Sequence, residues 1–103
     1  MDDQKKLIAD FHEAMLELYS RALAEEDYNG TIFYKMIMEV GGLQTAKQLL
    51  RRNAGSYGFE VLALEKNRPD LTVEYLVLQP KWAGLFLPEH LSVARERLGI
   101  SPR

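Results

Sequence analysis

Residues 4–27 read QKKLIADFHEAMLELYSRALAEED, and this stretch decides the fold class. Its apolar side chains recur at alternating steps of three and four, at Ile8, Phe11, Met15, Leu18 and Ala22. That spacing puts them on one stripe of an α-helix, and no Gly or Pro interrupts it. We therefore predict a long amphipathic helix that faces a core, begins at a cap provided by Asp2 or Asp3, and stops at Asn29-Gly30.

The remainder of the chain predicts shorter helices separated by residues that favour turns. We expect helices over 32–40, 43–53, 59–67 and 88–98. Thr31 is the expected cap of the first, Gly41-Gly42 its expected stop, and Pro88 suits the first position of the last. Gly99 is expected to close the last helix.

Residues 70–78 fit either a strand or a helix. Their Val, Tyr and Thr content favours a strand, but the only partner would leave a two-stranded hairpin, which is marginal. Asp70 as N-cap and Pro80 just beyond the end favour a helix, which we predict. The expected fold is therefore all-α, a compact orthogonal bundle of five or six helices. It forms one domain over 1–103, with 1–27 as the long helix and 28–103 as a helical core.

Composition excludes several classes of function. The chain has 103 residues and no Cys, which removes disulfides, zinc–thiolate sites, iron–sulfur clusters and Cys nucleophiles. No apolar run approaches the roughly 18 residues needed to span a bilayer, so we expect no membrane partner. The start, Met1-Asp2-Asp3, is acidic where a signal peptide is basic, and we expect a cytoplasmic protein.

Charge is unevenly distributed along the chain. Residues 1–27 hold 8 acids and 3 bases, whereas 28–54 hold 1 acid and 4 bases. The basic concentration is Lys47, Arg51 and Arg52, with Lys35 and Tyr57 nearby in sequence. It suits either a solvated helix end or contact with nucleic-acid phosphates. A helix-turn-helix motif fits poorly, because Leu50 stands where its turn glycine belongs.

Two further clusters are candidate sites. Trp82, Phe86 and Tyr75 make an aromatic corner, which suits either a hot spot for a protein partner or the edge of the core. Arg68, Asp70 and Glu74 form a polar cluster, either a site or a helix cap with a buried salt bridge. We favour the structural role for this second cluster.

Catalytic and metal-binding patterns are missing. His12 and His90 stand far apart in sequence, and neither has a second ligand-type residue four positions on. Gly55-Ser56-Tyr57-Gly58 is not a nucleophile elbow, and no phosphate-cradling glycine motif occurs. We expect no enzyme, no metal and no cofactor.

From residue 28 onward the pattern resembles a bacterial family of small helical domains without an established activity. The matching pieces are Tyr28-Asn29-Gly30-Thr31, Gly41-Gly42-Leu43 with Thr45-Ala46, Gly58-Phe59, Asp70-Leu71-Thr72-Val73-Glu74, Leu76-Val77-Leu78, Leu85-Phe86, Ala94-Arg95 and Arg97-Leu98. The resemblance covers about three quarters of the chain and implies no catalytic residue. Leu87 departs from it, since a polar cap is expected there.

The absence of a catalytic pattern and the aromatic corner together favour one function. We predict a small helical interaction module that binds a protein partner or itself, through Trp82, Phe86 and Tyr75 and the first helix. The alternative is a nucleic-acid-associated accessory domain that uses Lys47, Arg51 and Arg52. An enzyme centred on Arg68, Asp70 and Glu74 is the third hypothesis.

Overall fold

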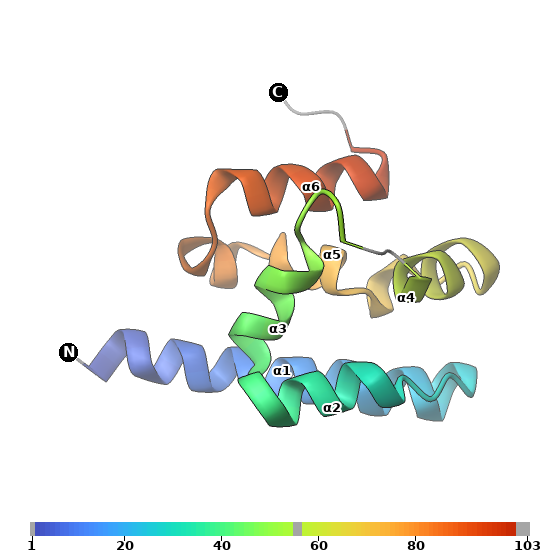
Figure 1. The fold of residues 1–103 in the computed structure, drawn as a ribbon, viewed down its shortest axis with the longest axis horizontal. Helices are drawn as coiled ribbons and strands as arrows, with labels where there is room; N and C mark the ends of the chain where they lie inside the picture. The colour runs from blue at the N-terminus through green and yellow to red at the C-terminus, as the bar shows by residue number, and fades with distance from the viewer. Residues whose placement is uncertain (1, 55–56, 101–103) are drawn as a thin grey trace. The chain divides into compact units, whose positions relative to one another are not determined.

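A computed structural model describes residues 2–54 and 57–100, and within these ranges it contains helices and turns but no strand (Figure 1). The predicted all-α class is confirmed for this part of the chain, including residues 70–78. The chain divides into two compact units, Met1–Thr45 and Ala46–Arg103. The expected single domain stays a prediction. Within the described ranges, no helix is both long enough and apolar enough to cross a membrane.

The first unit begins with the predicted long helix, α1, which spans Asp2–Glu26. Phe11, Met15, Leu18 and Ala22 are buried as their spacing predicted. Pairs four residues apart, Lys6 with Asp10 and Arg21 with Glu25, lie on its exposed surface. The helix therefore has the amphipathic character that its sequence requires.

The end of α1 differs from the expectation that Asn29-Gly30 stops it. The helix ends at Glu26, because Asp27 takes the left-handed conformation with φ of 54°. The N–H of Tyr28 then turns back to donate to the carbonyl of Ala22 at 3.1 Å. Aspartate tolerates this conformation better than most residues with a side chain.

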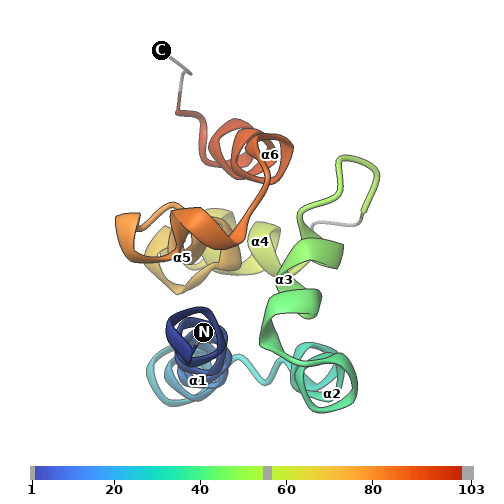
Figure 2. The same cartoon turned by 90° about the vertical axis from the view of Figure 1, so that its left-hand side faces the viewer.

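Helix α2 spans Thr31–Val40 and runs antiparallel to α1 (Figure 1), side by side with it (Figure 2). Thr31 is its first helical residue rather than its cap, which is Gly30. Ile37 is buried, so its side of α2 faces the interior. Gly41 ends α2 with φ of 89°, as expected.

Gly42 begins the next helix, so the prediction that both glycines end α2 is wrong for the second one. Helix α3 spans Gly42–Leu49. The N–H of Gly42 donates to Nδ1 of His12 at 2.9 Å. A Cβ at Gly42 would lie 2.7 Å from Cα of His12, so only glycine fits this close approach. The first unit ends within α3, at Thr45.

The second unit continues from α3, which ends at Leu49 and not at the predicted residue 53. After a turn, α4 spans Tyr57–Phe59 and passes directly into η1, a π-helix over Glu60–Glu65. Val61 and Leu62 are buried there. Asn67, with φ of 57°, ends this segment.

A short 3₁₀ turn, η2, spans Pro69–Leu71 and leads into helix α5 over Val73–Val77. The N-cap of α5 is Thr72, not the predicted Asp70. Its hydroxyl accepts the N–H of Tyr75 at 3.1 Å and donates to the carbonyl of Pro69 at 2.7 Å. Thr72 has the extended conformation that a cap needs, because the preceding turn closes at Leu71.

The last two elements are η3, a 3₁₀ helix over Pro80–Leu85, and α6, over Pro88–Leu98. The bounds of α6 and its left-handed stop at Gly99 confirm the prediction. Leu87 is exposed and provides no cap. Instead Nδ1 of His90 accepts the N–H of Leu87 at 3.1 Å, the half of a capping box that N3 contributes.

Candidate functional site

The outward side of α2 carries apolar side chains where a solvated helix has polar ones. Ile32 is 76% exposed, and Met38 and Val40 are also exposed. Lys35 and Glu39, one turn apart, are exposed on the same helix. At 100° per residue Ile32 lies beside Glu39, and Met38 lies on the other side, next to Lys35. We call Ile32, Lys35, Met38 and Glu39 the α2 face.

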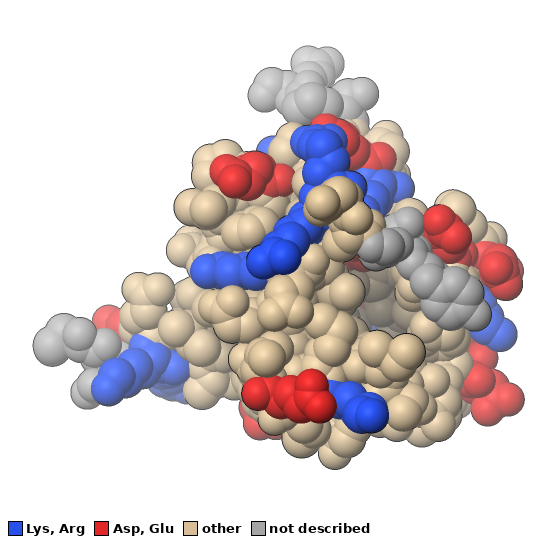
Figure 3. All heavy atoms as spheres, viewed as in Figure 1, with Lys and Arg blue, Asp and Glu red and all other residues tan. Residues whose placement is uncertain are grey.

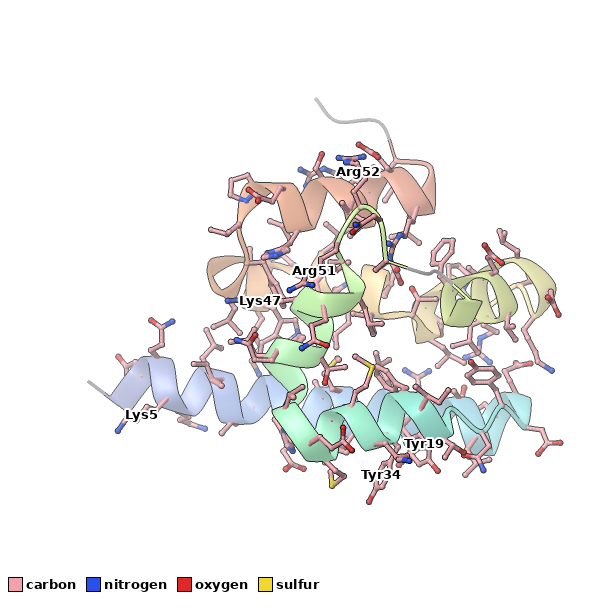
Figure 4. The ribbon with its side chains drawn as sticks, in the orientation of Figure 1. Lys5, Tyr19, Tyr34, Lys47, Arg51 and Arg52 are labelled. Carbon is pink, nitrogen blue, oxygen red and sulfur yellow. The ribbon has the colours of Figure 1, made fainter. Side chains whose placement is uncertain are left out.

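An aromatic contact fixes α2 on α1. The rings of Tyr19 and Tyr34, two residues labelled in Figure 4, meet with their centroids 4.9 Å apart. The hydroxyl of Tyr19 donates to Oδ1 of Asn29 at 2.9 Å, which ties the connecting loop to α1. The ring contact and this hydrogen bond therefore hold α1 and α2 together as a helical hairpin, and α2 carries the α2 face.

The structure brings Lys47, Arg51 and Arg52 together in a basic row. Figure 4 places them one after another along the end of α3 and the turn that follows, where Figure 3 shows a row of basic side chains. Arg51 and Arg52 belong to the turn, because α3 ends at Leu49. Both are exposed, and Lys47 is half-buried. Lys35 belongs to the first unit, and the side chain of Tyr57 lies outside the described residues.

One carboxylate contacts the basic row. Nη1 of Arg52 donates to Oε1 of Glu96 on α6, and the two side chains remain 64% and 51% exposed. This hydrogen bond and the charge of Arg52 lower the pKa of Glu96 below its usual range. The same bond and the charge of Glu96 raise the pKa of Arg52. Arg51 and Lys47 have no side-chain partner among the described residues.

Arg97 of α6 holds the turn that carries the row. Its Nη1 donates to the carbonyl of Leu49 at 2.7 Å and to Oε2 of Glu74 at 2.7 Å. Its Nη2 donates to the carbonyl of Arg51 at 3.0 Å. The side chains of Arg97 and Glu74 are only 13% and 5% exposed. A buried guanidinium with three acceptors fixes the backbone of the turn.

The predicted polar cluster separates into two ion pairs. Arg68 makes two hydrogen bonds to the carboxylate of Asp70, at 3.1 Å and 3.0 Å. Glu74 pairs with Arg97, not with Arg68. Asp70 and Glu74 do not lie on one helix, because Asp70 belongs to η2, before α5 begins. The structural interpretation expected a cap and a buried salt bridge: the cap is Thr72 and not Asp70, and the buried salt bridge joins Glu74 to Arg97, outside the cluster.

The predicted aromatic corner is largely interior. Trp82 and Phe86 are 6% and 8% exposed, whereas Tyr75 is 44% exposed. Of the two alternatives for this corner, Trp82 and Phe86 therefore fit the edge of the core and not an exposed hot spot. A 3₁₀ helix repeats every three residues, so Trp82 and Leu85 fall on the same buried side of η3. Lys81 lies over the Trp82 ring, with Nζ 4.8 Å from its centroid.

The two histidines act at helix starts. His12 accepts from the first residue of α3, and His90 accepts from the residue before α6. Within the described ranges, no group of three or more His, Cys, Asp and Glu side chains is placed to hold a metal ion.

Sequence reasoning missed two of these features. The apolar excess of α2 was visible, because Ile32, Met38 and Val40 together cannot all face one side of a helix. The contacts of Arg97 have no local signal, since its three acceptors lie 23 to 48 positions away.

No family model, curated protein or solved structure matches this sequence.

Proposed function

We propose that the chain is a small helical interaction module that binds a protein partner or a second copy of itself. The observation that carries this proposal is the α2 face, with Ile32 and Met38 exposed on a helix that a buried Ile37 already anchors. Exposed apolar side chains that flank charges are typical of a surface that meets another protein. The aromatic corner no longer supports it, because Trp82 and Phe86 are buried.

The charges of the α2 face favour a second copy of this chain as the binding partner. In an antiparallel pairing of two α2 helices, about a two-fold axis level with residue 37, Lys35 of each copy faces Glu39 of the other. Such an isologous contact is self-complementary. Lys35 and Glu39 make no ion pair within the described residues, so both are available. One helix face is smaller than the roughly 800 Å² per partner of a standard interface, so we expect a weak dimer.

Sedimentation over a range of concentrations tests this pairing. Lys35→Glu places like charges opposite each other twice and should weaken the dimer at least several-fold. Adding Glu39→Lys to it restores opposite charges and should restore the dimer. Ile32→Gln should also weaken it, whereas Leu64→Gln, at a position 69% exposed in the second unit, is the matched control and should not.

Three results would contradict the self-pairing. The first is a monomer at every concentration. The second is a dimer whose affinity does not change with Lys35→Glu, and the third is a double variant whose dimer is as weak as that of Lys35→Glu alone. If the chain is a monomer but binds a different protein through Ile32, the interaction module still holds and only the proposed partner is wrong.

The orthogonal packing of the helices, the bacterial family resemblance and the cytoplasmic location stay predictions from the sequence.

A further inference from the structure

The basic row of Lys47, Arg51 and Arg52 is not used by the proposed pairing of α2. Residues 46–54 contain these three cations and no acid. Residues 46–103 as a whole hold 9 Lys and Arg against 6 Asp and Glu. The row is thus a local positive surface on a chain whose net charge is -2.

The row is held in place before any ligand arrives. Arg97 binds the carbonyls of Leu49 and Arg51, so the backbone on which Arg51 and Arg52 stand is fixed from α6. A surface ordered in advance loses less conformational entropy when it binds. Because the side chains of Arg51 and Lys47 have no partner among the described residues, no contact of theirs has to break when a ligand binds.

Arg52 is the one member of the row with a described partner, and that partner is exchangeable. Its ion pair with Glu96 is more than half exposed on both sides, and such pairs contribute little to stability. A guanidinium binds phosphate oxygens with the same two-pronged geometry that suits a carboxylate. A phosphate can therefore replace Glu96 at little cost.

We propose that the basic row binds the phosphodiester backbone of a nucleic acid, and that a phosphate displaces Glu96 from Arg52 when it does. An acidic protein is the less favoured ligand, because protein interfaces have an apolar centre. Among the described residues between Val40 and Leu64, no large apolar side chain is exposed. Contacts to phosphates alone carry no sequence information, so binding is independent of base sequence.

Fluorescence anisotropy with a labelled DNA duplex and a labelled RNA, over a salt series and with the full chain, tests this site. We expect dissociation constants on the order of micromolar at low salt and a log–log salt slope of about −3 or shallower. Arg51→Gln with Arg52→Gln should weaken binding at least about tenfold and reduce the slope by about 2. Glu96→Gln should tighten binding several-fold, because it removes the competing carboxylate.

A matched control removes the same charge elsewhere. Lys5→Gln with Lys66→Gln neutralises two exposed lysines that lie outside the row and should leave affinity within about twofold. No binding at low salt would overturn the proposal, as would equal weakening by the control pair. Competition by polyglutamate as effective as that by unlabelled DNA would also overturn it, in favour of a general anion surface. Lys35→Glu should leave this binding unchanged, which separates its outcome from that of the α2 pairing.

Discussion

Nη1 of Arg97 lies 2.7 Å from Oε2 of Glu74 and also 2.7 Å from the carbonyl oxygen of Leu49. One cation thus joins α6 to α5 and to the end of α3 within the second unit. Removing one partner of a buried ion pair leaves an uncompensated charge, which is far more costly than losing an exposed pair. The stability of this unit should depend on Arg97 more than on any exposed charge.

Replacing Arg97 should therefore be strongly destabilising. We expect Arg97→Ala to lower the free energy of unfolding by about 3–5 kcal/mol, measured by chemical denaturation. Arg95→Ala, two residues earlier on α6, is the control and should change it by about 0.5 kcal/mol or less. The double variant Arg97→Met with Glu74→Leu should be less damaging than Arg97→Ala alone. If the double variant is at least as unstable as Arg97→Ala, the main loss comes from the hydrogen bonds of Arg97 to the carbonyls of Leu49 and Arg51.

Gly42 should not tolerate a side chain, although it is helical. A methyl group there would meet the backbone of His12 at 2.7 Å, which cannot move aside as a flexible side chain does. We expect Gly42→Ala to lower the melting temperature by an amount that corresponds to about 1–3 kcal/mol. Gly84→Ala has open space around the new Cβ and should stay within about 1 kcal/mol of the parent. Equal effects at the two positions would show that the close approach is unimportant.

Thr72 and Asp70 offer a direct comparison between the observed and the predicted cap. Thr72→Ala removes a hydroxyl that makes two hydrogen bonds and should cost about 1–2 kcal/mol in thermal or chemical denaturation. Thr72→Ser keeps the hydroxyl and should recover most of this loss. Asp70→Ala removes a partly exposed ion pair and should cost about 1 kcal/mol or less. A larger loss of stability in Asp70→Ala than in Thr72→Ala would mean that Asp70 is the cap.

Glu96 should titrate at a lower pH than an isolated glutamate. Because Arg52 stabilises the carboxylate, the pKa of Glu96 is lower in the folded state than in the unfolded state. Its contribution to stability is present above the unfolded-state pKa and is lost as the pH falls through the folded-state pKa. Arg52→Gln should raise the pKa of Glu96, measured by carbon-detected NMR titration of its carboxyl group. An unchanged pKa would mean that the pair does not persist in solution.

The features that the sequence predicted correctly depend on neighbouring residues. Helix α1, 25 residues long, carries a regular apolar stripe, and α6 is bounded by Pro88 and Gly99, so local rules suffice for both. By residue type Asp70 is at least as good a cap as Thr72. Thr72 becomes the cap because Pro69 starts a tight turn whose end leaves that residue extended.

The features that the sequence did not predict depend on contacts between distant segments. The sequence left open whether Trp82 lies in the core or at the surface, because nothing in it shows that Pro80–Leu85 adopts a three-residue repeat. Glu74 was grouped with Arg68 by proximity, whereas its partner lies 23 positions further along the chain. Of the candidate sites, the basic row is the one whose members the structure also places next to one another, since they are close in sequence.

The two histidines give each unit its own spectroscopic reporter. His12 in the first unit and His90 in the second both accept a backbone N–H through Nδ1, so each ring must carry its proton on Nε2. Nitrogen-15 chemical shifts distinguish this tautomer from the other one. Heating a sample labelled at histidine would therefore follow the start of α3 and the start of α6 separately in one spectrum. Simultaneous loss of the two signatures would mean that the halves melt as one cooperative body, and successive loss would mean that each half melts alone.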